Sequence, residues 1–196
     1  MKKIGLTGGI GSGKTYVAQI LEKMGYPVYY SDTRAKELCN EDPLIIRQLK
    51  ELLGDDAYKN EKLNKSFISN QIFSSPDLRE TINSIIHPIV RNDFEQWLEN
   101  LSSDSLVFNE AAILFETKSY KRFDETILVY APLEIKIQRL ISRDRVSREE
   151  ITAKMNAQWS DTKKMTLTRF HILNDEKTPL LEQIEEILEK LINKPV

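Results

Sequence analysis

The chain has 196 residues, with 28 lysines and arginines against 30 aspartates and glutamates. This length predicts one core domain with an insertion, and the balance of charge gives no basic surface for general nucleic-acid binding. The single Cys39 excludes an internal disulfide, and no apolar run approaches the ~20 residues of a membrane span, so we expect a cytoplasmic protein without nucleic-acid or membrane partners.

A glycine-rich loop lies between a predicted strand, residues 2–7, and a predicted helix, residues 16–24. Gly8, Gly13, Lys14 and Thr15 fill the pattern G-x-x-x-x-G-K-[ST]. Glycines let successive backbone N–H groups face phosphate oxygens, and the following helix adds the positive end of its dipole. In this pattern the lysine reaches the β- and γ-phosphates and the threonine hydroxyl binds Mg²⁺. We therefore predict ATP and Mg²⁺ as cofactors, Thr15 as the metal ligand, and a nucleotide site formed by Gly9, Gly11, Ser12, Gly13, Lys14, Thr15 and Tyr16.

Asp32 follows the second predicted strand, Val28–Tyr30. The helix between the two strands is expected to stop at Gly25, and a strand–helix–strand unit of this length predicts a parallel sheet. Ligands of open α/β sheets bind beyond the carboxyl ends of the strands. A carboxylate there can accept a proton from a hydroxyl that attacks the γ-phosphate. Asp32 can equally cap a helix that begins near Thr33.

The stretch from 33 to 100 has helical periodicity and no convincing strand. Ser75 is expected to cap a helix that ends before His87-Pro88, and a further apolar stripe follows. A helical stretch of this length is too long for a plain crossover connection between two strands. The sequence therefore predicts a helical subdomain where a phosphate acceptor can bind.

Charged residues after the third and fourth strands complete the candidate site. Glu110 or Glu116 can serve the metal or its waters, and their spacing does not choose between them. Four arginines then follow, at 139, 143, 145 and 148. Arginine suits phosphate and can close over a triphosphate, although a solvated helix face paired with acidic residues is the alternative. We favour a lid, with Arg139 on the nucleotide.

Several segments resemble the dephospho-CoA kinases. They are Gly5–Thr15, Ser31-Asp32 at the end of the family's Asp-Ala-Asp motif, IHPIVR at Ile86–Arg91, ILFE at Ile113–Glu116, the lid residues Gln138-Arg139, Arg143-Asp144 and Gln158, and Asn174 after the last strand. The loop alone occurs in many kinases, whereas the combination at these separations is specific.

The resemblance implies transfer of the ATP γ-phosphate to the ribose 3′-hydroxyl of dephospho-CoA. By this analogy Asp32 is the catalytic base, and Lys14 and Arg143 stabilise the transferring group. The residues expected to bind dephospho-CoA are Asp32, His87, Arg91 and Glu116. His87 and Arg91 can equally hold the helical domain together. The alternative function is another nucleoside or small-metabolite P-loop kinase; the base-reading motif of a GTPase switch is missing.

The predicted fold is an α/β, three-layer P-loop NTPase fold with a five-stranded parallel sheet, a helical insertion and a small helical lid. The predicted domains are a core of 1–32, 101–140 and 165–196, a helical acceptor domain of 33–100 and a lid of 141–164. The chain departs from the family pattern at Tyr16, Tyr30, Ala112 and Thr168-Arg169. None of these changes removes a group that the mechanism requires, but Tyr16 can alter contacts around the nucleotide.

Overall fold

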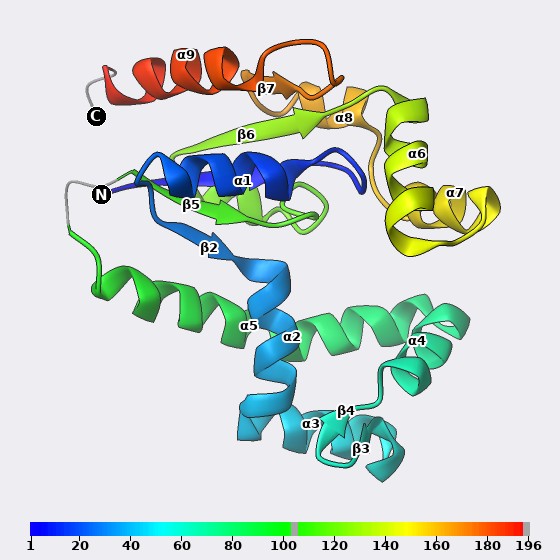
Figure 1. Cartoon of the computed structure of the whole chain (residues 1–196). Coiled ribbons are helices and arrows are strands. Elements are labelled where there is room, and N and C mark those ends of the chain that lie inside the picture. Colours follow the sequence, from blue (N-terminus) through cyan, green and yellow to red (C-terminus); the bar gives the residue numbers. More distant parts are fainter. Residues whose placement is uncertain (103–105, 194–196) are drawn as a thin grey trace. The chain divides into compact units, whose positions relative to one another are not determined.

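The computed structural model describes residues 1–102 and 106–193. These residues form two compact units, one of Met1–Tyr29 with Ser102–Val196 and the other of Tyr30–Leu101 (Figure 1). Residues 103–105 and 194–196, which the predicted core ranges include, lie outside the described residues.

The first unit is built on a five-stranded sheet with the strand order β2-β5-β1-β6-β7. Its strands are β1 (Lys2–Thr7), β2 (Val28–Tyr30), β5 (Leu106–Glu110), β6 (Glu125–Tyr130) and β7 (Phe170–Leu173). Strand β1 pairs in parallel with β5 and β6, and β6 pairs in parallel with β7. The predicted α/β fold with a five-stranded parallel sheet is confirmed.

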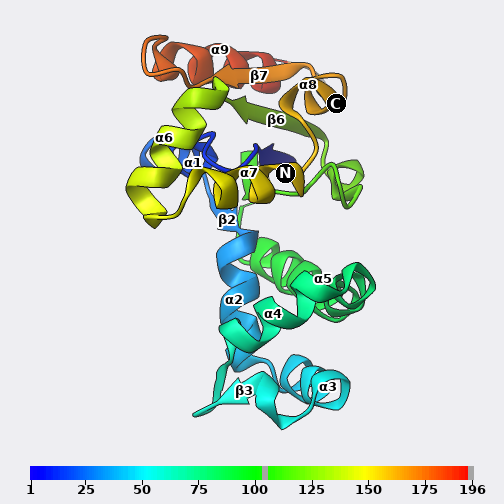
Figure 2. The same cartoon turned by 90° about the vertical axis from the view of Figure 1, so that its right-hand side faces the viewer.

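The central strands are buried over most of their length, as strands covered on both faces must be. Helix α1 (Lys14–Lys23) covers one face through buried Val17, Ala18 and Leu21. The short helix α8 (Asp161–Met165) lies on the opposite side of the sheet in Figure 2. The right-handed crossover rule explains why α1 and α8 lie on opposite faces. The connection from β1 to β2 and the connection from β6 to β7 run in opposite directions along the sheet, so their helices cover opposite faces.

Helix α1 ends as its sequence predicts. Gly25 has a left-handed φ of 91°, its N–H donates to the Glu22 carbonyl, and the Tyr26 N–H donates to the Leu21 carbonyl. These two bonds are the Schellman arrangement that a glycine at this position favours. Helix α9 (Leu180–Ile192) packs on β7, and its Ile184, Ile187, Leu188 and Leu191 are buried.

Two helices follow the carboxyl end of β6 (Figure 1): α6 (Leu133–Asp144) and α7 (Arg148–Asn156). Helix α6 ends at Arg145, whose φ of 54° is left-handed, and Ser147 starts α7 with a capping box. Buried Ile137, Leu140 and Ile151 hold the two helices together, and Ile10 of the glycine-rich loop packs against this cluster. The loop and these helices therefore share one hydrophobic contact.

The second unit is mainly helical. Its elements are α2 (Ser31–Glu41), α3 (Pro43–Leu53), the 3₁₀ turn η1 (Asp55–Ala57), β3 (Tyr58–Lys59), β4 (Lys62–Leu63), α4 (Lys65–Ser74) and α5 (Pro76–Glu99). The prediction of a stretch without strands is wrong at one place, because β3 and β4 form a small antiparallel hairpin. Asn60 and Glu61 turn it with φ of 52° and 62°, the left-handed pair of a type I′ turn.

Helix α5 also differs from the prediction. Ser75 caps it as expected, its hydroxyl accepting from the Leu78 N–H at 3.3 Å, but the helix runs through Pro88 without ending. Proline removes one backbone hydrogen bond and crowds the preceding turn. Buried Ile82, Val90, Phe94 and Leu98 lie on both sides of the proline, and their packing keeps the helix continuous. No helix within 1–102 and 106–193 is long and apolar enough to cross a membrane.

Candidate active site

The glycine-rich loop has the backbone shape that its glycines predict. Gly11 and Gly13 have left-handed φ values of 80° and 86°. A Cβ added to Gly13 would overlap the side-chain amide of Asn174, and one added to Gly11 would lie 2.8 Å from the Lys136 carbonyl oxygen. A Cβ on either residue would therefore meet both strain and a clash.

Lys14 and Thr15 meet one buried carboxylate at the start of α1. Glu110 is the last residue of β5 and is paired in register with Leu6 of β1, so its side chain lies at the loop. One oxygen, Oε1, lies 2.9 Å from Lys14 Nζ and accepts from the Thr15 hydroxyl at 2.8 Å. The sequence left Glu110 and Glu116 open as the carboxylate for the metal or its waters, and of the two it is Glu110 that contacts Lys14 and Thr15.

Glu116 has different partners. Its Oε1 accepts from the Trp159 N–H at 3.0 Å and lies 2.9 Å from Nζ of Lys164, which is fully buried. Its other oxygen, Oε2, is buried and makes no hydrogen bond within the described part of the chain. Sequence reasoning missed Lys164, because nothing in the polar sequence of α8 distinguishes a buried lysine from an exposed one.

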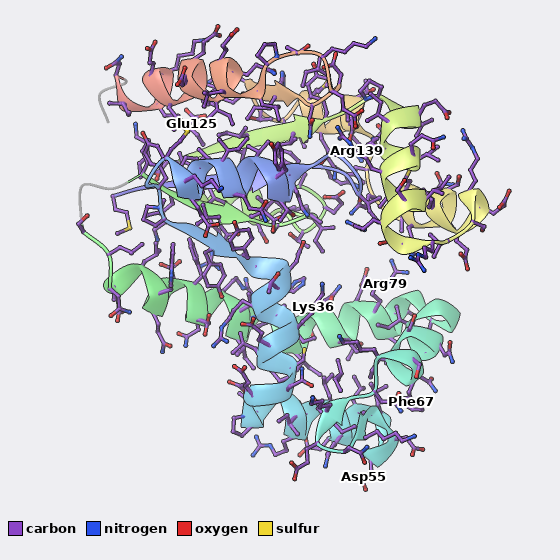
Figure 3. All side chains as sticks on the ribbon, in the orientation of Figure 1. Lys36, Asp55, Phe67, Arg79, Glu125 and Arg139 are labelled. Carbon is purple, nitrogen blue, oxygen red and sulfur yellow. The ribbon has the colours of Figure 1, made fainter. Side chains whose placement is uncertain are left out.

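Arg139 lies against the back of the loop (Figure 3). Its guanidinium donates to the carbonyls of Gly11 and Ser12 at 3.3 and 3.4 Å, and to both oxygens of Asn174 at 3.1 Å. The Asn174 amide donates in turn to the Ser12 carbonyl at 2.9 Å. Arg139 and Asn174 are thus brought to the loop, where they fix its backbone.

A groove opens beside Arg139 and Asn174. It has a volume of about 670 Å³ and is lined by Gly13, Tyr16, Ile20, Arg139, Asn174 and residues 176–181. Tyr16, at the first turn of α1, is 58% exposed, which is unusual for a large aromatic side chain and leaves its ring available to a ligand.

Two further arginines of the cluster, Arg143 and Arg148, lie in exposed ion pairs. Arg143 is 64% exposed and binds the Asp144 carboxylate through two hydrogen bonds of 2.7 and 2.9 Å. This pairing raises the pKa of Arg143 and lowers the pKa of Asp144. Arg148 pairs with Glu134 at 2.6 Å. In this structure the arginine that contacts the loop is Arg139, one turn before Arg143.

Three polar side chains from the segment 133–165 contact or face the loop. The Gln158 side chain accepts from the Ile10 N–H at 2.9 Å. Lys136 and Asp161 form an ion pair of 2.6 Å beside Gly9. The sequence analysis included Gln158 in the lid pattern but missed Lys136 and Asp161, since only the fold shows that α6 and α8 present this pair to the loop.

In the second unit, the charges of Asp32 and Arg91 both act on His87. Asp32 is the second residue of α2, and Tyr30 takes the N-cap position without a side-chain bond, so the capping interpretation of Asp32 is wrong. Burial lowers the pKa of His87, Arg91 lowers it further, and the charge of Asp32 partly opposes both. The Arg91 side chain donates to the His87 carbonyl at 3.0 Å. The charges that act on His87 thus come from Asp32 on α2 and from Arg91 on its own helix, α5.

Comparison with known proteins identifies the family. The family model described as dephospho-CoA kinase matches residues 2–179. The dephospho-CoA kinase of Bacteroides fragilis is 40% identical over 192 residues, which cover 98% of this chain and 94% of the relative. The solved structure of TT1252 from Thermus thermophilus superposes with a TM-score of 0.84 at 33% identity and covers 97% of this chain and 96% of its own.

A further solved structure, the dephospho-CoA kinase from Campylobacter jejuni, shares the fold with a TM-score of 0.67 at 20% identity, over 96% of this chain and 94% of its own. The extent of the family match and of the identity to relatives leaves one assignment. The chain belongs to the dephospho-CoA kinase family, a family of ATP-using kinases.

Proposed function

We propose that this protein transfers the γ-phosphate of ATP to the ribose 3′-hydroxyl of dephospho-CoA, giving CoA and ADP. The observation that carries the proposal is the loop at the start of α1, where left-handed Gly11 and Gly13 shape the backbone and Lys14 follows directly. Backbone N–H groups, a lysine and a helix N-terminus together suit a triphosphate. Phosphoryl transfer then depends mainly on positioning and on neutralising charge.

The donor nucleotide would extend from the groove to the loop. The groove has the size of a small-molecule site, and the exposed Tyr16 ring offers a stacking surface for a purine. Arg139 would support the loop and lie near the nucleotide. The phosphates would then be bound by Lys14 and by the amides of Gly9, Gly11, Ser12 and Gly13.

The residues at the loop also fit Mg²⁺. The Thr15 hydroxyl and the Glu110 carboxylate are hard oxygen donors 2.8 Å apart. No group of three or more His, Cys, Asp or Glu residues in the described ranges could hold a metal by itself, and Mg²⁺ usually binds through one or two protein oxygens together with phosphates. Thr15 would be a direct ligand and Glu110 would hold its waters. The ion supplies charge neutralisation to the triphosphate.

The acceptor residues are assigned by the family resemblance and supported by local geometry. Asp32 would accept the proton of the 3′-hydroxyl from its position in the first turn of α2. His87 and Arg91 would bind the acceptor within the helical domain of 33–100. Glu116 would contribute through its unpartnered Oε2. The stretch 141–164 would act as the lid, and Arg143 would leave its exposed pair with Asp144 to reach the transferring phosphate.

A coupled ADP-release assay with Mg·ATP tests the proposal. Dephospho-CoA is compared with adenosine, AMP and no acceptor, and we expect turnover with dephospho-CoA alone. Turnover confined to another acceptor would retain a kinase but overturn the acceptor assignment. The Lys14→Ala variant is the control for the site, because it should lose nucleotide binding and turnover together.

A further inference from the structure

Lys136 extends from α6 to the glycine-rich loop. Its side chain is 12% exposed, and its Nζ lies 2.6 Å from Oδ2 of Asp161, which is 17% exposed. A Cβ built on Gly9 would lie 3.1 Å from the other Asp161 oxygen and 3.8 Å from Lys136 Nζ. The ion pair therefore lies against the face of the loop at Gly9, where the loop has no side chain of its own.

This end of the loop is where the last phosphate of the donor would lie. The groove that we assign to the base is lined by Gly13 and Tyr16, at the helical end of the loop. A triphosphate that begins there and follows the loop amides reaches Gly9 with its terminal group. Besides Lys14, the side chains of Lys136 and Asp161 would thus face the terminal phosphate.

A terminal phosphate would change the balance of this ion pair. It carries more negative charge than a carboxylate and offers three oxygens, so it attracts an ammonium group more strongly. The same phosphate would be repelled by Asp161. Gln158 occupies a phosphate position in a similar way. Its side-chain oxygen accepts from the Ile10 N–H, and in loops of this kind that N–H points to the side where phosphate binds.

We propose that Lys136 is a further phosphate-binding residue of the donor site, which exchanges Asp161 for the terminal phosphate of ATP. The proposal deepens the proposed function and rests on it only in taking a nucleoside triphosphate as the donor. Asp161 then acts as a competitor that holds Lys136 in position before the nucleotide enters.

The two residues should therefore respond to mutation in opposite directions. We expect Lys136→Met to weaken binding of a non-hydrolysable ATP analogue by about tenfold or more, as the loss of a charge-assisted bond implies, while ADP binding changes by less than about threefold. We expect Asp161→Asn to tighten binding of the analogue by about threefold, because the competitor is neutral and Lys136 is retained. Isothermal titration calorimetry without acceptor measures these three affinities against those of the wild-type protein.

Two further variants complete the test. Lys136→Arg keeps the charge and should restore most of the affinity for the analogue. Lys163→Met is the matched control, because this lysine of α8 lies over the Trp159 ring at 3.4 Å and should not distinguish the analogue from ADP.

A purely structural pair would give a different pattern. Lys136→Met and Asp161→Asn would then both lower the melting temperature and weaken the ATP analogue and ADP equally, and this result would overturn the proposal. Equal loss of the analogue and ADP in Lys136→Met alone would also overturn it. Because no acceptor is present, the outcome is independent of whether the wild-type protein phosphorylates dephospho-CoA.

Discussion

At the scale of single residues, Glu110 Oε1 is a buried, negatively charged oxygen that needs a positive partner. It is shared by Lys14 and Thr15, and the Glu110 side chain is 3% exposed. With Lys14 as its partner the buried charge is neutralised, which a buried carboxylate requires. A triphosphate that takes Lys14 away would leave two anions close together, and the Mg²⁺ that we propose at Thr15 and Glu110 would neutralise them.

Cys39 is the residue whose chemistry burial changes most clearly. It is 4% exposed, and burial raises the pKa of its thiol from 9.0 to about 11. At pH 8 the thiolate, which is the reactive form, is then about 100-fold less populated than in the unfolded chain. We expect a thiol reagent such as DTNB to react with the native protein about 100-fold more slowly than with the protein in guanidinium chloride, measured at 412 nm with an absorbance stopped-flow.

The same pKa shift predicts a pH dependence of stability. As the pH rises from 9 towards 11, the unfolded thiol ionises before the folded one, so the unfolded chain binds fewer protons and the free energy of unfolding falls. A Cys39→Ala variant should lose this part of the alkaline dependence. Rapid labelling of the native protein at pH 8 would contradict the assignment of Cys39 as an inert core residue.

At the scale of the elements, local signals predicted the pieces that local physics controls. The glycine at 25 and the serine at 75 cap their helices as expected, since each acts on its own turn. The glycine-rich loop was also predictable, because its function requires those residue types in that order. Where prediction failed, packing between distant segments decided: α5 continues through Pro88 because both of its halves share one buried face.

The candidate site divides in the same way. Lys14, Thr15 and Arg139 could be named from the sequence because they belong to a motif or a cluster. The sequence could not identify Lys136, Lys164 and Asp161 in this way. The role of each depends on the side chain from another element that faces it. That Glu110 lies beside Lys14 and Thr15 likewise depends on the register of β5 beside β1.

Helices α2 and α5 are joined by one arginine. Arg34 of α2 donates to both carboxylate oxygens of Asp93 on α5 at 3.0–3.2 Å, and to Glu37 and Glu41 on its own helix. The Asp93 hydrogen bonds are the main reason why the pKa of Arg34 is raised above its usual value. An ion pair in which a planar guanidinium binds a partly buried carboxylate through two nitrogens stabilises a protein more than an isolated surface ion pair does.

We therefore expect Arg34→Met to lower the free energy of unfolding by about 1–2 kcal/mol, measured from the midpoint of a urea transition with an unchanged slope. Arg47→Met is the control, because Arg47 and Glu51 are both 67% exposed and 3.8 Å apart, and its removal should cost less than about 0.5 kcal/mol. Equal effects of the two substitutions would show that the arginine does not join the helices.

At the scale of the whole molecule, the proposed roles are distributed over two units. The residues proposed to bind the donor belong to the unit of the parallel sheet, whereas Asp32 belongs to Tyr30–Leu101. Binding of the donor and activation of the acceptor can therefore be changed separately.

The Asp32→Asn variant tests this separation. We expect kcat to fall by about 100-fold or more, the usual contribution of a general base, while the Kd for ATP changes by less than about twofold. Asp42→Asn is the matched control in the same unit: Asp42 caps α3, asparagine caps a helix equally well, and kcat should stay unchanged. Unchanged turnover in Asp32→Asn would rule out Asp32 as the base.

The hydrogen bond between the Ile10 N–H and the Gln158 side chain joins positions 148 residues apart in the sequence. It gives the protein an internal probe that needs no label beyond nitrogen-15. In an NMR spectrum the Ile10 amide resonance would move when its acceptor changes from a side-chain carbonyl to a phosphate oxygen, and its exchange with deuterium would report how often that bond opens in solution. One amide signal would thus follow the state of the loop through a complete turnover cycle.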